Sequence, residues 1–127
     1  MSYRKVNIYG SGGHANVIIE TLLSQNRSLA DQFDDDPQLV RASNGKLKPG
    51  LNLLADKFEH PTDPWIIAIG HLATRQKLAE LLNNNDGKQP VFTNAIHSSA
   101  IVSNRSSIGD GTVVLAGVVV QPNARIG

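Results

Sequence analysis

A branched aliphatic residue at every sixth position of the last 32 residues restricts the fold of this chain more than any other feature. The six positions are Ile96, Val102, Ile108, Val114, Val120 and Ile126. A smaller residue comes four places after each of the first five: Ala100, Ser106, Thr112, Val118 and Ala124. A period of six fits neither a helix nor a simple strand alternation, but it is typical of a hexapeptide β-helix. We expect the aliphatic side chains to stack inside a triangular coil and the smaller residues to let the chain turn at its corners. An ordinary strand meander is the alternative.

Before Ile96, short apolar runs alternate with segments of helical periodicity. Residues 6–9 predict a strand that ends at a glycine cluster, and residues 15–24 predict a helix. Further strands are expected at 29–33 and 65–69, the second of them unbroken and apolar like a buried parallel strand. This alternation predicts a parallel sheet with right-handed crossovers.

The remaining segments of the N-terminal part give weaker signals. Residues 37–64 are rich in Gly, Asn, Lys and Pro, which indicates irregular structure with one short element near 51–58. A helix is expected after Gly70, with Thr74 as a cap, and it ends in the polar run at 83–87. Its inner face would carry Leu78, Leu81 and Leu82, and another strand would begin at Val91 and Phe92.

These patterns predict two domains of α/β and β-helical type. Residues 1–95 would form a small Rossmann-like parallel-sheet domain, and residues 96–127 would form the first coils of a left-handed parallel β-helix. The sequence stops at Gly127, in the opening of another repeat. A solenoid needs a terminal cap, so we expect the β-helix to be incomplete and the chain truncated.

The glycine-rich sequence GSGGHA at 10–15 is the main candidate for a binding site. It fits the G-x-G-x-x-(G/A) fingerprint and lies between a predicted strand and a predicted helix. Glycines let the backbone approach a pyrophosphate, and the helix start supplies free N–H groups with a partial positive charge. Asp34, Asp35 and Asp36 follow where such folds hold an acidic group against a ribose or base. The alternative is a tight turn followed by a solvated acidic loop.

Other polar residues leave two interpretations open. His14 could donate to a phosphate or sugar, or be a partly exposed histidine at the helix start. His71 follows a strand at the edge where open α/β sheets bind ligands, but it also fits a surface loop. Arg75 could bind a phosphate bidentately or lie on an exposed helix face. His60 and His97 fit structural or exposed positions, and no metal-ligand spacing or Ser-His-Asp arrangement stands out.

Composition excludes several classes of function. Lys and Arg total 12 and Asp and Glu total 11, so no strong field favours nucleic acid or an anionic membrane. The absence of cysteine excludes disulfides, a thiol nucleophile and a thiolate zinc site. The first ten residues lack the apolar stretch of a signal peptide, and the longest apolar run is too short for a bilayer. We expect a cytoplasmic protein.

Four segments together resemble a known enzyme family: NIYGSGGHANVIIETL, FDDDP, WIIAIGHLATRQKL and NAIHSSAIVSNRSSIGDGTVVLAGVVVQPNARIG. The chain is similar over nearly its whole length to bacterial sugar O-/N-acyltransferases of the sialic-acid O-acetyltransferase and UDP-4-amino-sugar N-acetyltransferase type. The resemblance implies an N-terminal domain that binds a UDP-4-amino-4,6-dideoxy sugar. The glycine loop would contact sugar and phosphate, an acidic pair would read the uracil, and a strand end would border the pocket. The matching positions are Gly10, Ser11, Gly12, Gly13, His14, Asp35, Asp36, Ile69 and Gly70.

The resemblance also implies a homotrimer that binds acetyl-CoA between neighbouring β-helices. In that family a histidine on a later coil, backed by an acidic residue, is the general base. No position up to Gly127 matches this histidine, so no catalytic residue is expected in this chain. The implied function is acetyl-CoA-dependent N- or O-acetylation of a nucleotide-activated sugar in bacterial surface glycan synthesis, with the chain alone inactive.

A non-catalytic module that binds a nucleotide or an NAD-type dinucleotide is the alternative function. A full dinucleotide fold needs two strand–helix halves around a switch point. Here the hexapeptide repeats begin soon after one half and a few extra strands, which favours a mononucleotide-linked ligand. The sequence leaves open which sugar is bound and which atom is acylated.

Overall fold

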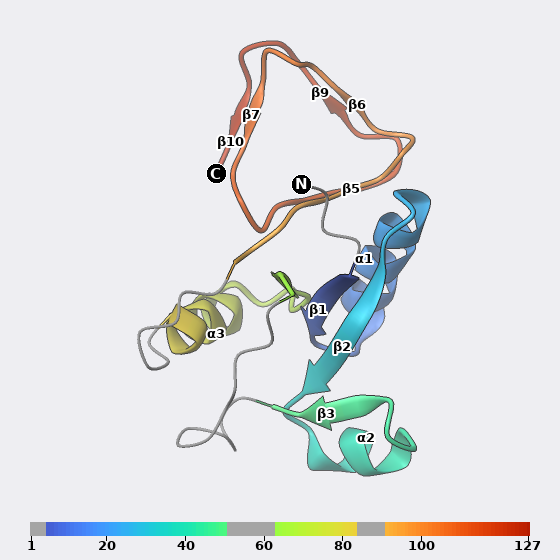
Figure 1. The fold of residues 1–127 in the computed structure, drawn as a ribbon. Coiled ribbons are helices and arrows are strands. Elements are labelled where there is room, and N and C mark those ends of the chain that lie inside the picture. Colours follow the sequence, from blue (N-terminus) through green and yellow to red (C-terminus); the bar gives the residue numbers. More distant parts are fainter. Residues whose placement is uncertain (1–4, 51–62, 84–90) are drawn as a thin grey trace.

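The computed structural model describes residues 5–50, 63–83 and 91–127. Its N-terminal part is a four-stranded parallel sheet of order β3-β2-β1-β4 (Figure 1). The strands are β1 (Lys5–Tyr9), β2 (Ser28–Asp34), β3 (Leu47–Pro49) and β4 (Trp65–Ile67). The helices are α1 (Gly13–Ser24), α2 (Pro37–Ala42) and α3 (Leu72–Asn83). The predicted parallel α/β arrangement is therefore confirmed.

Alternation along β1 divides the core between the two faces of the sheet. Val6 and Ile8 are fully buried and belong to a cluster that includes Ile18 and Leu22 of α1. Tyr9 is also fully buried but belongs to a second cluster, in which it packs with Phe33, Trp65, Ile67 and Leu78 of α3. Successive strand residues point to opposite faces of the sheet. Helix α1 therefore covers one face and helix α3 covers the other.

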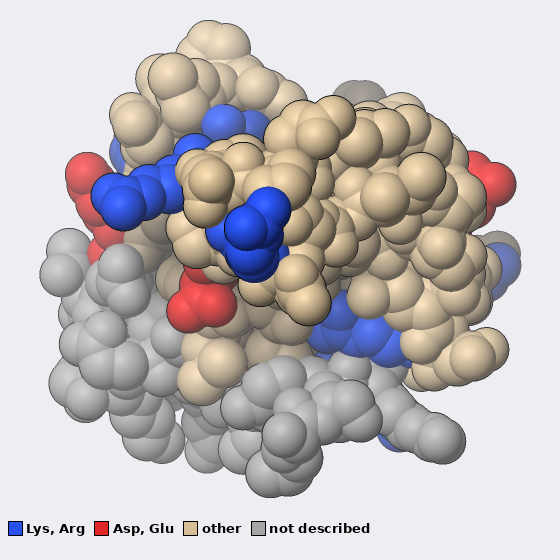
Figure 2. Space-filling view, turned by 90° about the horizontal axis from the view of Figure 1, so that it is seen from above, with Lys and Arg blue, Asp and Glu red and all other residues tan. Residues whose placement is uncertain are grey.

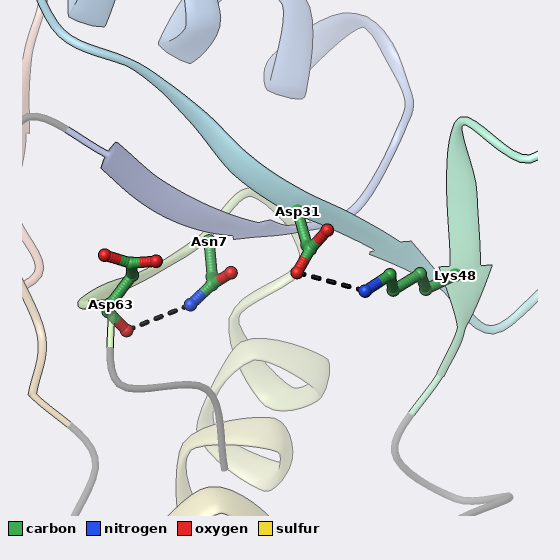
Figure 3. Close-up of polar contacts among 4 residues, drawn as sticks. All are labelled: Asn7, Asp31, Lys48 and Asp63. Carbon is green, nitrogen blue, oxygen red and sulfur yellow. Dashed lines mark hydrogen bonds and ion pairs between the residues drawn. The ribbon is translucent and has the colours of Figure 1, made fainter. Parts of the chain in front are cut away.

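Polar contacts on the α3 face join neighbouring segments (Figure 3). The buried Asn7 of β1 donates from Nδ2 to the carbonyl oxygen of Asp63, at 2.9 Å, just before β4. Lys48 of β3 lies 3.1 Å from a carboxylate oxygen of Asp31 on β2. The Lys48 side chain is more than half exposed, so this ion pair adds little to stability. The approach to β4 is held by the Asn7 side-chain bond and by the Asn7 backbone N–H, which donates to the Pro64 carbonyl at 2.8 Å.

The C-terminal part is a parallel β-helix of short strands (Figure 1). Its strands are β5 (Ala95–Ile96), β6 (Ile101–Val102), β7 (Ser107–Ile108), β8 (Val113–Val114), β9 (Val119–Val120) and β10 (Arg125–Ile126). They pair β5 with β8, β6 with β9 and β7 with β10, all parallel. Each pair joins residues 18 positions apart, so three hexapeptides make one coil. The fold class predicted from the period of six is confirmed.

The coil interior contains the predicted aliphatic residues. Val114 and Val120 are buried, and the other four positions are half-buried, so none of the six is exposed. Their neighbours one residue earlier point outward, and the three outer faces differ. Ala95 and Val113 lie against α1, Ile101 and Val119 are exposed, and the third face carries a serine and an arginine.

The corners of the coil differ in one respect from the expectation. At three of the five corners the turn is made by the residue before the small one, because Gly111, Gly117 and Asn123 have positive φ angles of 82°, 74° and 66°. These are the residues for which that region is least costly. The small residue closes the turn, as when the Ala124 N–H donates to the Gln121 carbonyl at 3.2 Å. One of the small positions, Val118, is exposed.

Helix α1 connects the two parts. Near its C-terminal end, Oγ of Ser24 accepts from the Ser98 N–H and Oε1 of Gln25 accepts from the Ile96 N–H, both at 3.0 Å. Arg27 donates to the Asn94 carbonyl at 2.6 Å, and burial lowers the pKa of its guanidinium. Ala95 of β5 is fully buried in the α1 cluster. The predicted boundary between residues 95 and 96 thus falls within β5, and the division into two domains remains a prediction.

Several predicted elements have different bounds in the structure. The strand expected at 65–69 ends at Ile67, because β1 turns away at Gly10 and leaves the next residues without a neighbouring strand. The strand expected at Val91 is a single bridge between Phe92 and Trp65. Helix α3 begins before Thr74, and Nδ1 of His71 accepts from the Thr74 N–H at 3.3 Å, so His71 is the capping residue.

Two short elements lie where irregular structure was expected. Asp36 caps α2 by accepting from the Gln38 N–H at 2.9 Å, with Pro37 as the first helical residue. Helix α2 connects β2 to β3, and β3 then pairs in parallel with β2. The element expected near 51–58 lies outside the described residues, as do the side chains of Leu81 and Leu82.

Charged side chains are dispersed on the face of the molecule shown in Figure 2. On the face seen in Figure 2, described basic and acidic residues occur in separate groups among uncharged ones, without forming one continuous stripe. Within residues 5–50, 63–83 and 91–127, no helix is long and apolar enough to cross a membrane.

Candidate functional site

A cavity of about 300 Å³ opens at the carboxyl ends of β1, β2 and β4. Its lining residues are Tyr9, Gly10, Ser11, Gly12, Gly13, His14, Asp34, Asp35, Ala68, Ile69 and Gly70. The strand order reverses between β1 and β4, because the chain runs outward from β1 to β3 and then crosses back. Open α/β sheets bind ligands outside the strand ends at such a switch point.

Gly10 makes the turn that forms the floor of the cavity. Its φ of +122° is costly for other residues, and an added Cβ would lie 2.6 Å from the Ala68 carbonyl oxygen. Its N–H donates to the Phe33 carbonyl at 2.7 Å, and its carbonyl accepts from Nε2 of Gln32 at 2.8 Å. The fold itself therefore requires glycine here.

Gly12 and Gly13 lie at the start of α1 under different constraints. Neither has a positive φ, and a Cβ added to either would meet no atom within 4 Å. Gly12 is the N-cap residue and makes no side-chain cap bond, and the first turn has no acidic residue. The first N–H groups of a helix have no partner within it, so this end of α1 offers donors and a partial positive charge to the cavity.

The three consecutive aspartates take different positions. Asp34 accepts from Oγ of Ser11 through Oδ2 and from the Asp36 N–H through Oδ1, at 2.8 Å for the second bond. Asp35 lines the cavity and accepts from the hydroxyl of Tyr9. Asp36 was expected in the acidic pair, but its carboxylate caps α2 and it does not line the cavity. The two aspartates of the lining are Asp34 and Asp35.

One residue of the cavity lining and one residue beside it were not found from the sequence. Tyr9 was assigned only to a strand, yet its hydroxyl reaches Asp35. Gly50 follows β3, and a Cβ there would overlap both Oδ1 of Asp35 and the Tyr9 hydroxyl. The sequence gives no signal for either contact, because both depend on the order of the strands in the sheet.

The remaining candidates divide into two groups. His14, Ile69 and Gly70 line the cavity as expected. His71 and Arg75 do not belong to the lining. The His71 side chain contacts the start of α3, where its Nδ1 lies 2.9 Å from Oγ1 of Thr74. Arg75 is exposed on the same helix. The surface interpretation suits both residues better than a contact with ligand.

The comparison with known families gives the cavity its context. The sequence profile of the PglD N-terminal domain matches residues 5–82, which include every residue that lines the cavity. This chain belongs to the PglD N-terminal domain family. The cavity therefore lies wholly within the region shared by the PglD N-terminal domain family.

Individual relatives of this PglD-type chain are acetyltransferases. UDP-N-acetylbacillosamine N-acetyltransferase of Bacillus subtilis (strain 168) is 34% identical over 115 residues, which are 89% of this chain and 52% of the relative. A variant of GDP-perosamine N-acetyl transferase from Caulobacter crescentus, solved with CoA and GDP-perosamine, is 32% identical with a TM-score of 0.74. The match covers 97% of this chain and 57% of that one.

A third relative of the PglD-type chain extends the same pattern. The acetyltransferase domain of PglB from Neisseria gonorrhoeae FA1090, solved with acetyl coenzyme A, is 26% identical with a TM-score of 0.73. The match covers 98% of this chain and 59% of that one. The chain thus spans about half the length of the relatives it matches.

Proposed function

We propose that this chain binds the nucleotide-activated sugar, a UDP-sugar, in an acetyl-CoA-dependent acetyltransferase. The observation that carries the proposal is the cavity at the start of α1, where Gly12 and Gly13 leave open space. A pyrophosphate there would accept from N–H groups that α1 leaves without helical partners. The carboxylate of Asp35 would then lie on the side of the nucleoside. The pyrophosphate is the part of a nucleotide sugar that best fits a helix N-terminus.

The two kinds of glycine in the loop support this proposal. Gly10 is needed by the backbone, whereas neither φ nor a nearby atom explains glycine at 12 and 13. A ligand that approaches the backbone closely would explain them, because a side chain would occupy its place. A tight turn alone accounts for Gly10 but not for Gly13, and at Gly12 it leaves only the mild preference for glycine at an N-cap position.

An NAD-type module is the second candidate function, and the sheet disfavours it. A dinucleotide fold has two βαβαβ halves flanking the switch point. In the described ranges, three strands lie on one side of the switch point and only β4 lies on the other. After β4 and α3 the chain enters the β-helix. A ligand with one nucleoside fits this arrangement better than a dinucleotide.

Acetyl transfer also needs a general base and a groove that binds acetyl-CoA. A base must take a proton from the sugar amine or hydroxyl while that group attacks the thioester of acetyl-CoA and releases the thiol. His14 is exposed in the first turn of α1, and no carboxylate of the described residues accepts a hydrogen bond from its ring. We expect the base and most of the acetyl-CoA groove in the part of the longer relatives that this chain does not match.

This assignment predicts that the 127-residue chain releases no thiol from acetyl-CoA above background when a UDP-amino sugar is added. Thiol release is followed with a chromogenic disulfide that reacts by thiol–disulfide exchange. A longer form with the later coils is the positive control. Turnover by the 127-residue chain that His14→Ala abolishes would place the base in the N-terminal part and contradict the assignment.

A homotrimer is part of the same proposal. The outward row on β6 and β9 is apolar, with Ile101 67% exposed and Val119 53% exposed. The row on β7 and β10 is Ser107 and Arg125, and the row on β5 and β8 is covered by α1. Burial of Ile101 and Val119 against neighbouring copies would remove apolar surface from water. We place the subunit contact on this row. We also propose that the enzyme is cytoplasmic.

A further inference from the structure

A buried tyrosine holds one of the aspartates that line the cavity. The Tyr9 hydroxyl donates to Oδ1 of Asp35. Tyr9 has no exposed surface, and its ring stacks on Phe33 with centroids 6.3 Å apart and planes 13° from parallel. Because the ring is fixed on two sides by the core, the hydroxyl is a rigid donor. Asp35 itself is exposed, so a surface carboxylate is tied to an immobile group.

Gly50 closes the space on the same side of Asp35. This residue is buried at the end of β3, and a Cβ on it would overlap both Oδ1 of Asp35 and the Tyr9 hydroxyl. Its φ does not lie in the left-handed region, so backbone conformation does not explain the glycine. The absence of a side chain is what lets Tyr9 and Asp35 meet. Strands β1, β2 and β3 therefore all contribute to the orientation of one carboxylate.

The oxygen atoms of the neighbouring aspartates are engaged differently. Both oxygens of Asp34 accept hydrogen bonds within the protein, and Oδ1 of Asp36 accepts from the α2 backbone. Oδ2 of Asp35 receives no hydrogen bond from the part of the chain that the structure describes, and Asp35 lines the cavity. Of the three carboxylates, the one on Asp35 has an oxygen available to a ligand in the cavity.

We infer that Tyr9 is a positioning residue, which fixes one oxygen of Asp35 so that the other accepts from a donor on the bound nucleoside. The inference rests on the proposed function, because it takes the ligand to be a uridine nucleotide. The donor is the N3–H of the base or the 2′-hydroxyl of the ribose. A hydrogen bond to a carboxylate is stronger than one between neutral groups, and a pre-oriented acceptor loses less entropy on binding.

The test compares UDP with two analogues that each lack one donor, N3-methyl-UDP and 2′-deoxy-UDP, by calorimetry on the 127-residue chain. We expect wild type to bind one analogue at least about tenfold more weakly than UDP, as loss of a hydrogen bond to a charged group implies. The weaker analogue identifies the donor as base or ribose. In Tyr9→Phe, which removes only the hydroxyl, we expect this ratio to fall toward one.

Two further variants separate positioning from stability. Val6→Ala changes the opposite face of β1, so it should lower the urea midpoint and keep the wild-type ratio. In Asp35→Asn, the ratio of UDP affinity to analogue affinity should fall to about one. Adding Tyr9→Phe to this variant should not change the ratio further. Gly50→Ala repeats the test without touching Tyr9, and it should reduce the ratio by displacing Asp35.

The outcomes are distinct. A wild-type ratio in both Tyr9→Phe and Gly50→Ala, with a lost ratio in Asp35→Asn, would overturn the positioning role while the proposed function stands. Equal binding of all three ligands by wild type would overturn the inference as well, since Asp35 would then read no donor. Failure of wild type to bind UDP at all would contradict the proposed function and the inference that rests on it.

Discussion

Gly10 and Gly13 lie three residues apart in one loop and are glycines for different reasons. Gly10 has a φ of +122° and its Cα faces the Ala68 carbonyl oxygen, so a methyl group there would be strained and would overlap backbone. Gly13 is the first residue of α1, and a methyl group on it would meet open space. The first is a requirement of the fold, and we attribute the second to the ligand.

This difference predicts opposite effects on stability. Gly10→Ala should lower the free energy of unfolding by on the order of 2 kcal/mol, because the residue would occupy a strained region of backbone space. Gly13→Ala should leave it unchanged or slightly raised, because alanine favours a helix. Urea unfolding followed by circular dichroism measures both. Equal loss in the two variants would mean that Gly13 also has a structural constraint.

At the scale of single residues, the sequence predicted which residues line the cavity better than it predicted the polar contacts among them. The glycine loop with His14, and Asp35, Ile69 and Gly70, were predicted at the site and do line the cavity. Asp36 was predicted in the acidic pair but caps α2 outside the lining, and three equal residues in a row give no clue to which one caps the next helix. The contacts of Tyr9 and Gly50 with Asp35 were missed, because they join three strands that only the folded sheet brings together. Whether these residues bind a nucleotide sugar remains a prediction.

Among the secondary-structure elements, the β-helix strands show most directly how sequence period becomes structure. Each strand has two residues, one directed into the coil and one directed outward. Val120 is directed inward with 5% of its surface exposed, while Val119 beside it is 53% exposed. The two residues have the same chemistry and adjacent backbone positions, so they form a matched pair.

Val120→Ala should lower the free energy of unfolding by about 1–2 kcal/mol, because two buried carbon atoms are removed from the coil interior. Val119→Ala should change it by less than about 0.5 kcal/mol, as is usual for an exposed position. Thermal or urea unfolding gives both values. A larger loss at Val119 than at Val120 would mean that the two side chains are exchanged between inside and outside.

Elements with a long or repeated signal were predicted, and short ones were not. The repeat of six specified all the described β-helix strands because every coil reinforces the same pattern. Helix α2 and strand β3 have six and three residues, too few for a hydrophobic period to show. The pair Asp36-Pro37 was a usable start signal for α2, since aspartate favours the N-cap and proline the first helical turn. The cap at His71 depends on where β4 ends, which the sequence did not define.

At the scale of the whole molecule, α1 belongs to both parts of the chain. Its N-terminus borders the cavity, and its C-terminal end accepts N–H groups from the first coil through Ser24 and Gln25. Ala95 of β5 packs into the same cluster as β1 and α1. The N-terminal part is therefore held against one outer face of the β-helix. Of the other two outer faces, only one is apolar.

The apolar row provides a test of assembly. In a longer form of the protein that includes later coils, Ile101→Lys should shift the trimer toward monomer, because a charge would be placed on a contact that buries Ile101. Ser107→Lys, on the polar row, is the control and should leave the trimer intact. Light scattering coupled to size-exclusion chromatography gives the mass of each. A trimer that survives Ile101→Lys unchanged would exclude this row as the contact.

We propose that the cavity at the start of α1 binds one nucleotide through its phosphates. Calorimetry of the 127-residue chain with UDP, GDP and NAD tests it most directly, with Gly12→Val as the blocked variant and Val119→Ala, on the outer face of the β-helix, as the control. We expect UDP to bind one site per chain more tightly than GDP or NAD, and Gly12→Val to abolish binding while the unfolding midpoint stays near wild type. Preference for NAD over UDP, or UDP binding that Gly12→Val leaves unchanged, would contradict the account.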